Sequence, residues 1–221
     1  MPSTIDLANA VLAVGSLGTA SFALVDATKA FGGGISNRGL GRIKSAVGRL
    51  LQVDSNAFRS VTNTLRANWI NGTASLSDQK AIAKTLIKLN LTPDNAEHMA
   101  AATGVNRGIL KQVATQYQKP NASLSPDEQN VAGRFDLQLA SLLDEAYQRA
   151  DQSYRNSAKV LAIAFAIALA IVAKLALEGT TNVPWGEAII AGVLAAPLAP
   201  VSKDLASALQ AAVKAMQVIR G

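Results

Sequence analysis

Residues 158–178 read AKVLAIAFAIALAIVAKLALE, and alanine alternates with larger apolar residues almost strictly from Leu161 to Ile171. A period of two is the pattern of a β-strand. However, alanine favours helices and is depleted in strands, and the stretch far exceeds a typical strand of about 5–6 residues. No charged side chain interrupts Val160 to Ala173. The pattern therefore predicts a helix that is apolar on all sides.

A helix that is apolar all round is either the core of a large soluble protein or a membrane span. Lys159 and Lys174 flank the apolar part, and such long side chains reach toward lipid headgroups. Continued to Leu177, the helix nearly covers a hydrocarbon layer of about 30 Å. We therefore expect a transmembrane helix. Its small residues form a candidate packing seam, made of Ala158, Ala162, Ala166, Ala173 and Ala176.

Two further apolar stretches predict membrane helices. Residues 7–25 contain no charge and are long enough to cross, so we assign residues 1–31 to a first transmembrane segment. Residues 183–201 are apolar except for Glu187 and end in prolines. This stretch fits either a full span or a re-entrant loop, and we favour the span. Residues 158–201 then form a transmembrane hairpin closed by a short loop.

Polar residues within these segments are the candidates for intramembrane function. An acid inside or at the edge of a span is a functional hypothesis by default, and Glu187 is placed to pair with Lys174 across the hairpin. The alternative is that Glu187 contacts water at the outer interface. Asn9 and Ser16 share one face of the first segment with small residues, which is typical of close helix packing.

The segment 32–157 has the amphipathic pattern of a helical bundle. Ser125, Pro126 and Glu128 have the spacing of a capping box, and the helix that they begin has no breaker before the apolar stretch. A long final helix would therefore couple this domain directly to the membrane. We expect helices at roughly 54–70, 78–89, 93–102, 106–117 and 126–157. The segment 202–221 predicts a C-terminal amphipathic helix that needs a partner surface.

A basic amphipathic helix follows the glycines at 32–34. Its apolar stripe begins at Leu40 and faces away from the basic side chains. Such a helix directly after a span lies on an anionic membrane surface or packs on the next helix, and the sequence leaves both interpretations open. The basic candidates for membrane-surface contact are Arg38, Arg42, Lys44 and Arg49.

Composition and charge support a membrane protein with a cytosolic domain. Of the 221 residues, 49% are hydrophobic and only 16% are charged, against about 25% in typical soluble proteins. Lys and Arg are absent before residue 26 and from the hairpin loop, but frequent after the first segment. The positive-inside rule then places the N-terminus outside and both the middle domain and the C-terminus in the cytosol, in a bacterial inner membrane.

The stretch AEHMAAATGVNRGILKQV, residues 96–113, resembles the helix-turn-helix of repressors. Ala100 and Gly104 stand where that family has a close helix crossing and a turn, and Val105, Leu110 and Val113 match its apolar positions. The resemblance implies DNA contacts by Asn106, Arg107, Lys111 and Gln112. Gly108 departs from the pattern because it weakens the recognition helix. The excess of five basic residues in 38–157 is modest for DNA binding, so nucleic acid is the less favoured partner.

The sequence offers many packing surfaces and no recognisable reaction centre. It has one histidine, no cysteine and no nucleotide-binding loop, so we expect no catalytic residue, metal or cofactor. The overall prediction is an all-α protein with three spans, a cytosolic helical bundle and a C-terminal amphipathic helix. We expect a non-enzymatic scaffold or anchor that self-assembles through small-residue seams and contacts membrane lipids and a cytosolic protein. The alternatives are a homo-oligomeric ion-conducting pore and a membrane-tethered DNA-binding protein.

Overall fold

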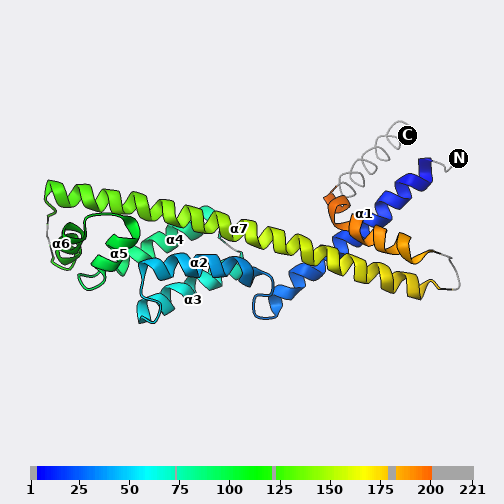
Figure 1. Cartoon of the computed structure of the whole chain (residues 1–221), viewed down its shortest axis with the longest axis horizontal. Helices are drawn as coiled ribbons and strands as arrows, with labels where there is room; N and C mark the ends of the chain where they lie inside the picture. The colour runs from blue at the N-terminus through cyan, green and yellow to red at the C-terminus, as the bar shows by residue number, and fades with distance from the viewer. Residues whose placement is uncertain (1–3, 73, 121–122, 179–182, 201–221) are drawn as a thin grey trace, which may run out of the picture. The chain divides into compact units, whose positions relative to one another are not determined.

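The computed structural model describes residues 4–72, 74–120, 123–178 and 183–200. Every regular element within these ranges is helical, which confirms the all-α prediction. The predicted C-terminal helix at 202–221 lies outside the described residues. Figure 1 shows the elements, which are α1 (Thr4–Ala27), η1 (Thr28–Ala30), α2 (Ser36–Leu50), α3 (Asn56–Asn71), α4 (Leu76–Leu89), α5 (Ala96–Thr103), α6 (Arg107–Tyr117), α7 (Pro126–Ala176) and a further helix, Trp185–Pro200.

The chain divides into two compact units. The central unit is Ser36–Tyr154, and the terminal unit combines Met1–Ile35 with Arg155–Gly221. Helix α7 contributes residues to both units because it continues without interruption over 51 residues. This confirms the prediction that the last helix of the middle domain runs directly into the apolar stretch.

Side-chain caps explain where most helices of the central unit begin. The hydroxyl of Ser55 accepts the N–H of Phe58 at the start of α3, and Ser75 caps α4 in the same way. Before α7, the N–H of Ser125 donates to the Glu128 carboxylate (2.7 Å) while the N–H of Glu128 donates to the Ser125 hydroxyl (3.3 Å). The reciprocal pair confirms the predicted capping box.

Helix α5 begins at Ala96, three residues later than the sequence pattern predicts. The side chain of Asn95 accepts the N–H of Thr92 (2.8 Å) and donates to the carbonyl of Asn90 (2.6 Å). These bonds hold the segment around Pro93 as a turn ahead of the helix, since an Asn side chain competes with helical backbone bonding.

The core of the central unit lies where α2 to α6 pack on the first part of α7. Tyr147 on α7 is the largest fully buried side chain, and its hydroxyl donates to the carbonyl of Gln79 (3.4 Å). Trp69 on α3 stacks edge-on against Tyr147, with the ring centroids 6.2 Å apart, and its indole N–H donates to the carbonyl of Ser36 (2.9 Å). The apolar residues around them include Ile43, Leu50, Leu65, Ile87, Met99, Leu110, Phe135, Leu139 and Leu143.

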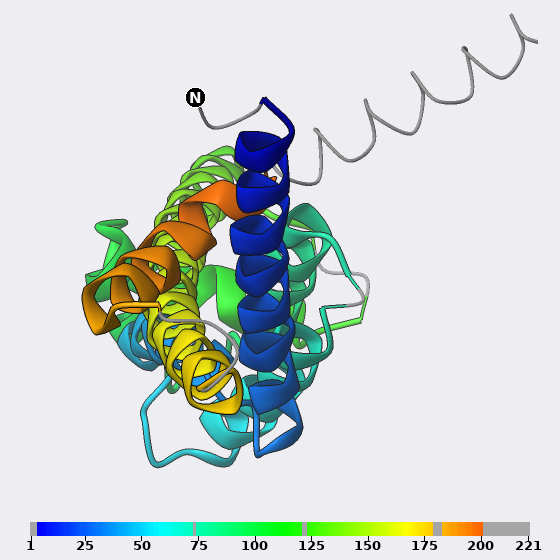
Figure 2. The same ribbon diagram turned by 90° about the vertical axis from the view of Figure 1, so that its right-hand side faces the viewer.

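Among the described residues of the terminal unit, three α-helical segments lie side by side, as Figures 1 and 2 show. They are α1, the end of α7 and the Trp185–Pro200 helix. Val25 on α1, Ala162 on α7 and Ala196 share one buried cluster. The Trp185–Pro200 helix has 16 described residues, so at 1.5 Å per residue it measures about 24 Å, short of a hydrocarbon layer of about 30 Å. A full third span therefore stays a prediction.

Candidate functional site

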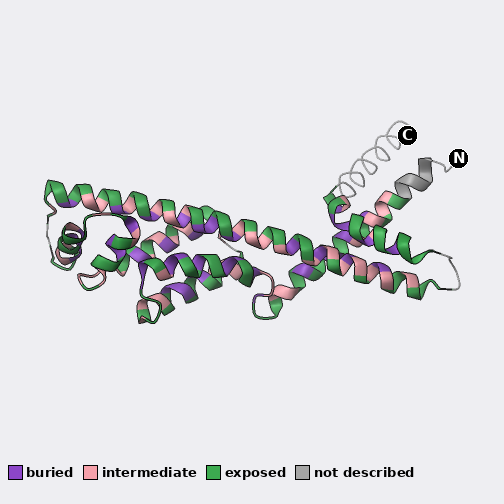
Figure 3. Cartoon of the chain, viewed as in Figure 1, coloured by how far each residue is buried: buried purple, intermediate pink, exposed green. Residues whose placement is uncertain are grey.

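The outer surface of the terminal unit is strongly apolar. Helices α1 and α7 each contain an apolar stretch long enough to cross a membrane, and only 22% of each stretch is buried. The core helix of a soluble protein would be mostly buried, so these two helices expose apolar side chains that the described part of the chain does not cover (Figure 3). The exposed large apolar residues include Leu24, Val160, Val172, Leu175, Leu177, Trp185, Ile189, Ile190, Val193 and Leu194.

Hydroxyl groups on α1 and η1 are satisfied within their own segment. Ser16 donates to the carbonyl of Leu12 (2.8 Å), Thr19 to Gly15 (3.0 Å) and Ser21 to Gly18 (2.7 Å). Thr28 donates to the carbonyl of Val25 (2.6 Å). Polar groups in contact with lipid must find partners within the protein because lipid offers none. This segment therefore carries its hydroxyls in a form that is compatible with lipid.

The small-residue seam of α7 is only partly as predicted. Ala158, Ala162 and Ala166 are buried, but the row continues through Ala170, whereas Ala173 and Ala176 are exposed. The reason is geometric: residues four apart form one ridge along a helix, and the neighbouring helix follows that ridge. The seam packs against other parts of the same chain, with Val25 and Ala196 in contact with it.

Two glycines bring the helices of the terminal unit to backbone contact. A Cβ on Gly18 of α1 would lie 2.0 Å from the carbonyl oxygen of Ala195, and one on Gly192 would lie 2.6 Å from the Cα of Ile167 on α7. No side chain fits at either position. Close approach of this kind is typical of helix packing in membranes, where backbones meet at small residues.

The buried face of α1 differs from the face that Asn9 and Ser16 mark. Gly15, Gly18, Ser21 and Val25 are buried, whereas Ser16 is exposed. Ala13 and Ala20 share the exposed side with Ser16. The side chain of Asn9 lies outside those that the structure describes. Of the two faces that the sequence pattern distinguishes on α1, the one with Gly15 and Gly18 is buried and the one with Ala13, Ser16 and Ala20 is exposed.

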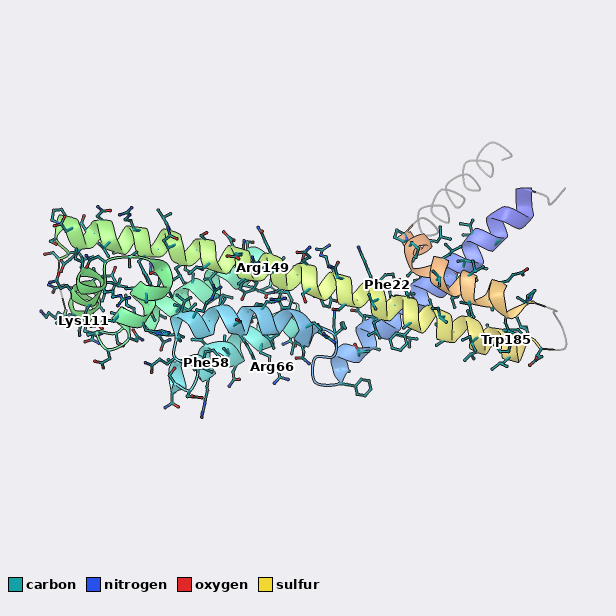
Figure 4. All side chains as sticks on the ribbon, in the orientation of Figure 1. Phe22, Phe58, Arg66, Lys111, Arg149 and Trp185 are labelled. Atoms are coloured by element: carbon teal, nitrogen blue, oxygen red, sulfur yellow. The ribbon has the colours of Figure 1, made fainter. Side chains whose placement is uncertain are left out.

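Lys174 has other partners than the predicted Glu187. Its ammonium group lies 3.9 Å from the carboxylate of Glu178 and 4.1 Å from the centroid of the Trp185 ring, which Figure 4 labels. Only 12% of the Lys174 side chain is exposed, so the contact with the ring covers most of it. Glu187 is exposed near the start of the Trp185–Pro200 helix. Among the described residues Lys174 therefore contacts Glu178 and Trp185, and the exposure of Glu187 agrees with the alternative that this carboxylate contacts water.

The basic helix α2 packs as an ordinary helix of the central unit. Its apolar side chains Leu40, Ile43, Val47 and Leu50 are all less than 4% exposed and therefore have no surface left for lipid. The structure thus supports the second of the two interpretations for this apolar face. The basic side chains Arg38, Arg42, Lys44 and Arg49 are exposed, so electrostatic contact with an anionic surface stays a prediction.

Helices α5 and α6 form a helix-turn-helix at the predicted position. Gly104 ends α5 in a left-handed conformation with φ of 70°, and the Asn106 side chain accepts the N–H of Ile109 (3.0 Å) at the start of α6. Ala100, Leu110 and Val113 are buried at the crossing. Arg107, Lys111 and Gln112 are exposed on one side of α6 (Figure 4 labels Lys111). Lys111 forms an ion pair with Glu97 (3.3 Å), which reduces the charge of this surface.

A network of charges joins α4 to α7 and was not predicted from the sequence. Lys84 and Lys88 donate to the two carboxylate oxygens of Asp136 at 2.7 and 2.8 Å, and Lys80 pairs with Asp144. These hydrogen bonds hold the pKa of Asp136 below its usual value. The three lysines are four residues apart and therefore lie along one face of α4. Their partners are 48 to 64 residues away in the chain, so no local pattern reveals them.

An open groove of about 570 Å³ lies beside this network. It is lined by Lys84, Lys88, Leu89, Tyr117 and neighbouring residues of α4 and α6. Leu89 is 75% exposed and Tyr117 is 56% exposed, so apolar surface and positive charge meet at the groove.

Chemistry for catalysis is not evident in the part of the chain that the structure describes. Within it, no group of three or more His, Cys, Asp or Glu residues is arranged to hold a metal ion. The only histidine of the chain, His98, is exposed on α5.

Comparison with protein-family models, curated proteins and solved structures finds no match for the chain.

Proposed function

We propose that the protein is a non-enzymatic membrane anchor or scaffold that holds the central unit at the cytosolic face of a bacterial inner membrane. The observation that carries this proposal is the low burial of two helices that are long and apolar enough to cross a bilayer. Packing in lipid accounts for their exposed side chains, for the hydroxyls bonded within α1, and for the glycines at the helix contacts.

Charge supports the proposed orientation. Lys and Arg are absent before Asp26, whereas α2 directly after α1 carries Arg38, Arg42, Lys44 and Arg49. Because basic segments stay on the cytosolic side, the central unit is assigned to the cytosol. There it presents the groove between α4 and α6 to a protein partner.

Self-assembly is proposed to use the outer face of α1. The alanine seam of α7 is occupied within the chain, so it offers no surface to a second copy. Ala13, Ser16 and Ala20 are small and exposed, and small residues allow two helices in lipid to approach closely.

Two substitutions on α7 test the membrane anchor. Val172 and Leu137 are both highly exposed apolar residues of this helix, 61% and 71%, but only Val172 lies in the apolar stretch. Val172→Asp is expected to reduce the amount of chain that remains in membranes after alkaline carbonate extraction, because a carboxylate in the hydrocarbon layer is unfavourable. The cost is about 2.5–3.5 kcal/mol at a helix centre and smaller at Val172, which lies two residues before Lys174. Leu137→Asp is the matched control and should leave that amount unchanged.

The unsubstituted chain should stay in the membrane pellet through carbonate and high salt and leave it only with detergent. Recovery of folded protein in the aqueous fraction without detergent would contradict the proposal. The proposal would also be contradicted if Val172→Asp and Leu137→Asp reduced the amount of membrane-bound chain equally, because that result would mean that both positions face the same solvent.

A second candidate function is DNA binding by α6, and the observed helix-turn-helix favours it. Arg107→Ala is expected to weaken binding to duplex DNA about tenfold, within the 1–3 kcal/mol typical of an arginine that contacts a base. Arg59→Ala is the control, because Arg59 is also exposed but lies on α3. Electrophoretic mobility shifts at several salt concentrations measure both. The absence of binding at low salt would exclude this function.

A further inference from the structure

Phe31 is 83% exposed, more than any other large apolar side chain that the structure describes. It lies directly after η1 and before three glycines whose φ angles are 68°, 99° and 46°. A phenyl ring that is exposed in this way is unfavourable in water.

The turn that carries Phe31 is held compact by its own backbone. The N–H of Phe31 donates to the carbonyl of Thr28 (3.0 Å), and the N–H of Gly33 donates to that of Lys29 (2.9 Å). A Cβ on Gly34 would lie 2.3 Å from the Thr28 carbonyl oxygen, so the turn folds directly back onto η1. Positive φ angles and this contact require glycine, and together they keep the ring on the outside.

The turn lies where the terminal unit changes from polar to apolar. Ile35, just after the glycines, packs against the buried cluster that contains Ala158 and Ala162 of α7. At this point of α7, exposed Lys159 is followed by Val160, which is 69% exposed and begins the apolar stretch. On α1, Leu24 is exposed one residue before the apolar stretch 7–25 ends. Phe31 therefore lies at the edge of the apolar surface.

We propose that Phe31 and the glycine turn at 32–34 form a wedge that inserts its ring at the boundary between headgroups and acyl chains of the inner leaflet. This proposal rests on the membrane anchor proposed above. Phe side chains of segments that lie on a membrane surface are buried at this boundary, and an exposed lysine such as Lys159 attracts anionic headgroups. A lipid surface fits better than a protein partner, because exposed apolar side chains, Leu24 on α1 and Val160 on α7, also lie at the ends of the two apolar stretches that meet the cluster beside this turn.

Depth-dependent quenching of tryptophan tests the wedge in the full-length chain. The chain is reconstituted into vesicles of phosphatidylethanolamine and phosphatidylglycerol that are brominated either near the glycerol end or near the terminus of the acyl chains. All variants carry Trp185→Phe, so that Trp69 in the central unit is the one native tryptophan left. Phe31→Trp is compared with Leu24→Trp, the control for lipid, and Val53→Trp, the control for water. Val53 is 57% exposed at the end of α2.

We expect the fluorescence of Phe31→Trp to be quenched about twofold more by bromine near the glycerol end than by bromine near the chain terminus, as for an interfacial aromatic residue. Leu24→Trp should show relatively more quenching by the deeper bromine, and Val53→Trp should add no quenching. Circular dichroism confirms that each variant keeps its helix content.

The outcomes separate the wedge from the anchor. If Leu24→Trp is quenched and Phe31→Trp is not, the wedge is overturned and the anchor stands. If Phe31→Trp is quenched mainly by the deeper bromine, the wedge is also overturned, because the turn would then lie within the hydrocarbon layer. If neither residue is quenched, the anchor itself fails and the wedge fails with it.

Discussion

At the scale of single residues, the absence of a side chain decides how the terminal unit packs. Gly18 and Gly192 lie where a Cβ would overlap the backbone of a neighbouring helix. Gly186 lies at the start of the same Trp185–Pro200 helix, and a Cβ there would meet nothing within 4 Å, so this position has room to spare. The two kinds of glycine look alike in the sequence and differ only in what surrounds them.

Gly18→Ala is expected to destabilise the terminal unit, whereas Gly186→Ala should be neutral or slightly stabilising. Overpacking of a tight contact typically costs about 1–3 kcal/mol, while alanine in an open helical position favours the helix. Thermal unfolding of the detergent-solubilised chain measures both variants. Equal midpoints for Gly18→Ala and the unsubstituted chain would show that α1 and the Trp185–Pro200 helix do not meet at Gly18.

Residue patterns predicted which side chains are small but not which of them meet a neighbour. The alanines of 158–176 mark the packing face of α7 correctly as far as Ala166, because helix periodicity is a local property. The continuation through Ala170 depends on the path of the neighbouring helix, and the periodicity of a single helix gives no information about that path. For the same reason the sequence does not specify the partner of Lys174, since Trp185 and Glu187 are close in sequence but Trp185 is the one that contacts the ammonium group.

At the scale of elements, Asp136 holds α4 against α7. Both carboxylate oxygens of Asp136 accept from lysines of α4, and the Asp136 side chain is 30% exposed. Pairs with this exposure are partly screened by water, so each contributes about 0.5–1 kcal/mol at most. The pairs join segments that are about fifty residues apart and therefore determine how the helices are arranged rather than whether they form.

Asp136→Asn is expected to lower the free energy of unfolding of the central unit by about 1 kcal/mol at pH 7. Because its pKa is lower in the folded chain than in the unfolded chain, the ion pair stabilises the fold above the unfolded pKa of about 3.9. This contribution is lost as the pH falls through the folded pKa. The difference between the variant and the parent should therefore be constant from pH 7 to about pH 5 and decrease below about pH 4.

Chemical denaturation followed by circular dichroism at several pH values gives these free energies. Asp94→Asn is the control, because Asp94 is exposed and its replacement should have little effect at any pH. A difference for Asp136→Asn that grows toward acid would contradict the proposed role of the carboxylate.

Helix boundaries were predictable from the sequence because caps are local. The capping contacts join residues only three positions apart, Ser125 with Glu128 and Asn106 with Ile109. Both helices begin where these residues predict. The start of α5 was missed because Asn95 bonds back to Asn90 and Thr92 and thereby prolongs the turn. Contacts between elements, such as the groove beside α4 and α6, combine distant segments and have no sequence signature.

At the scale of the whole molecule, the proposed self-assembly concerns the surfaces that the fold leaves open. The chain contains no cysteine, so single cysteines report contacts between copies without interference. In membranes treated with a mild oxidant, Ser16→Cys is expected to form a disulfide-linked dimer, because Ser16 is exposed on the outer face of α1. Ala162→Cys should stay monomeric, because Ala162 is fully buried within its own chain. Gel electrophoresis without reductant distinguishes the two.

A dimer of Ala162→Cys without one of Ser16→Cys would place the contact between copies at the α7 seam and contradict the proposed use of α1. If neither variant forms a dimer at any protein density, self-assembly through these helices is excluded.

The discontinuity of the terminal unit has a consequence for how the protein is made. Gly18 emerges from the ribosome long before Ala195, its neighbour in the finished fold. At translation rates of about 5–20 residues per second, α1 waits on the order of ten to thirty seconds for that neighbour. During this interval the central unit, which is contiguous in the chain, is synthesised completely and is free to fold. The face of α1 that contains Gly18 is meanwhile uncovered and accessible to other proteins. A factor that shields nascent helices would therefore bind α1 early in synthesis. It would leave α1 only when the helix that contains Ala195 has been made and packs against Gly18.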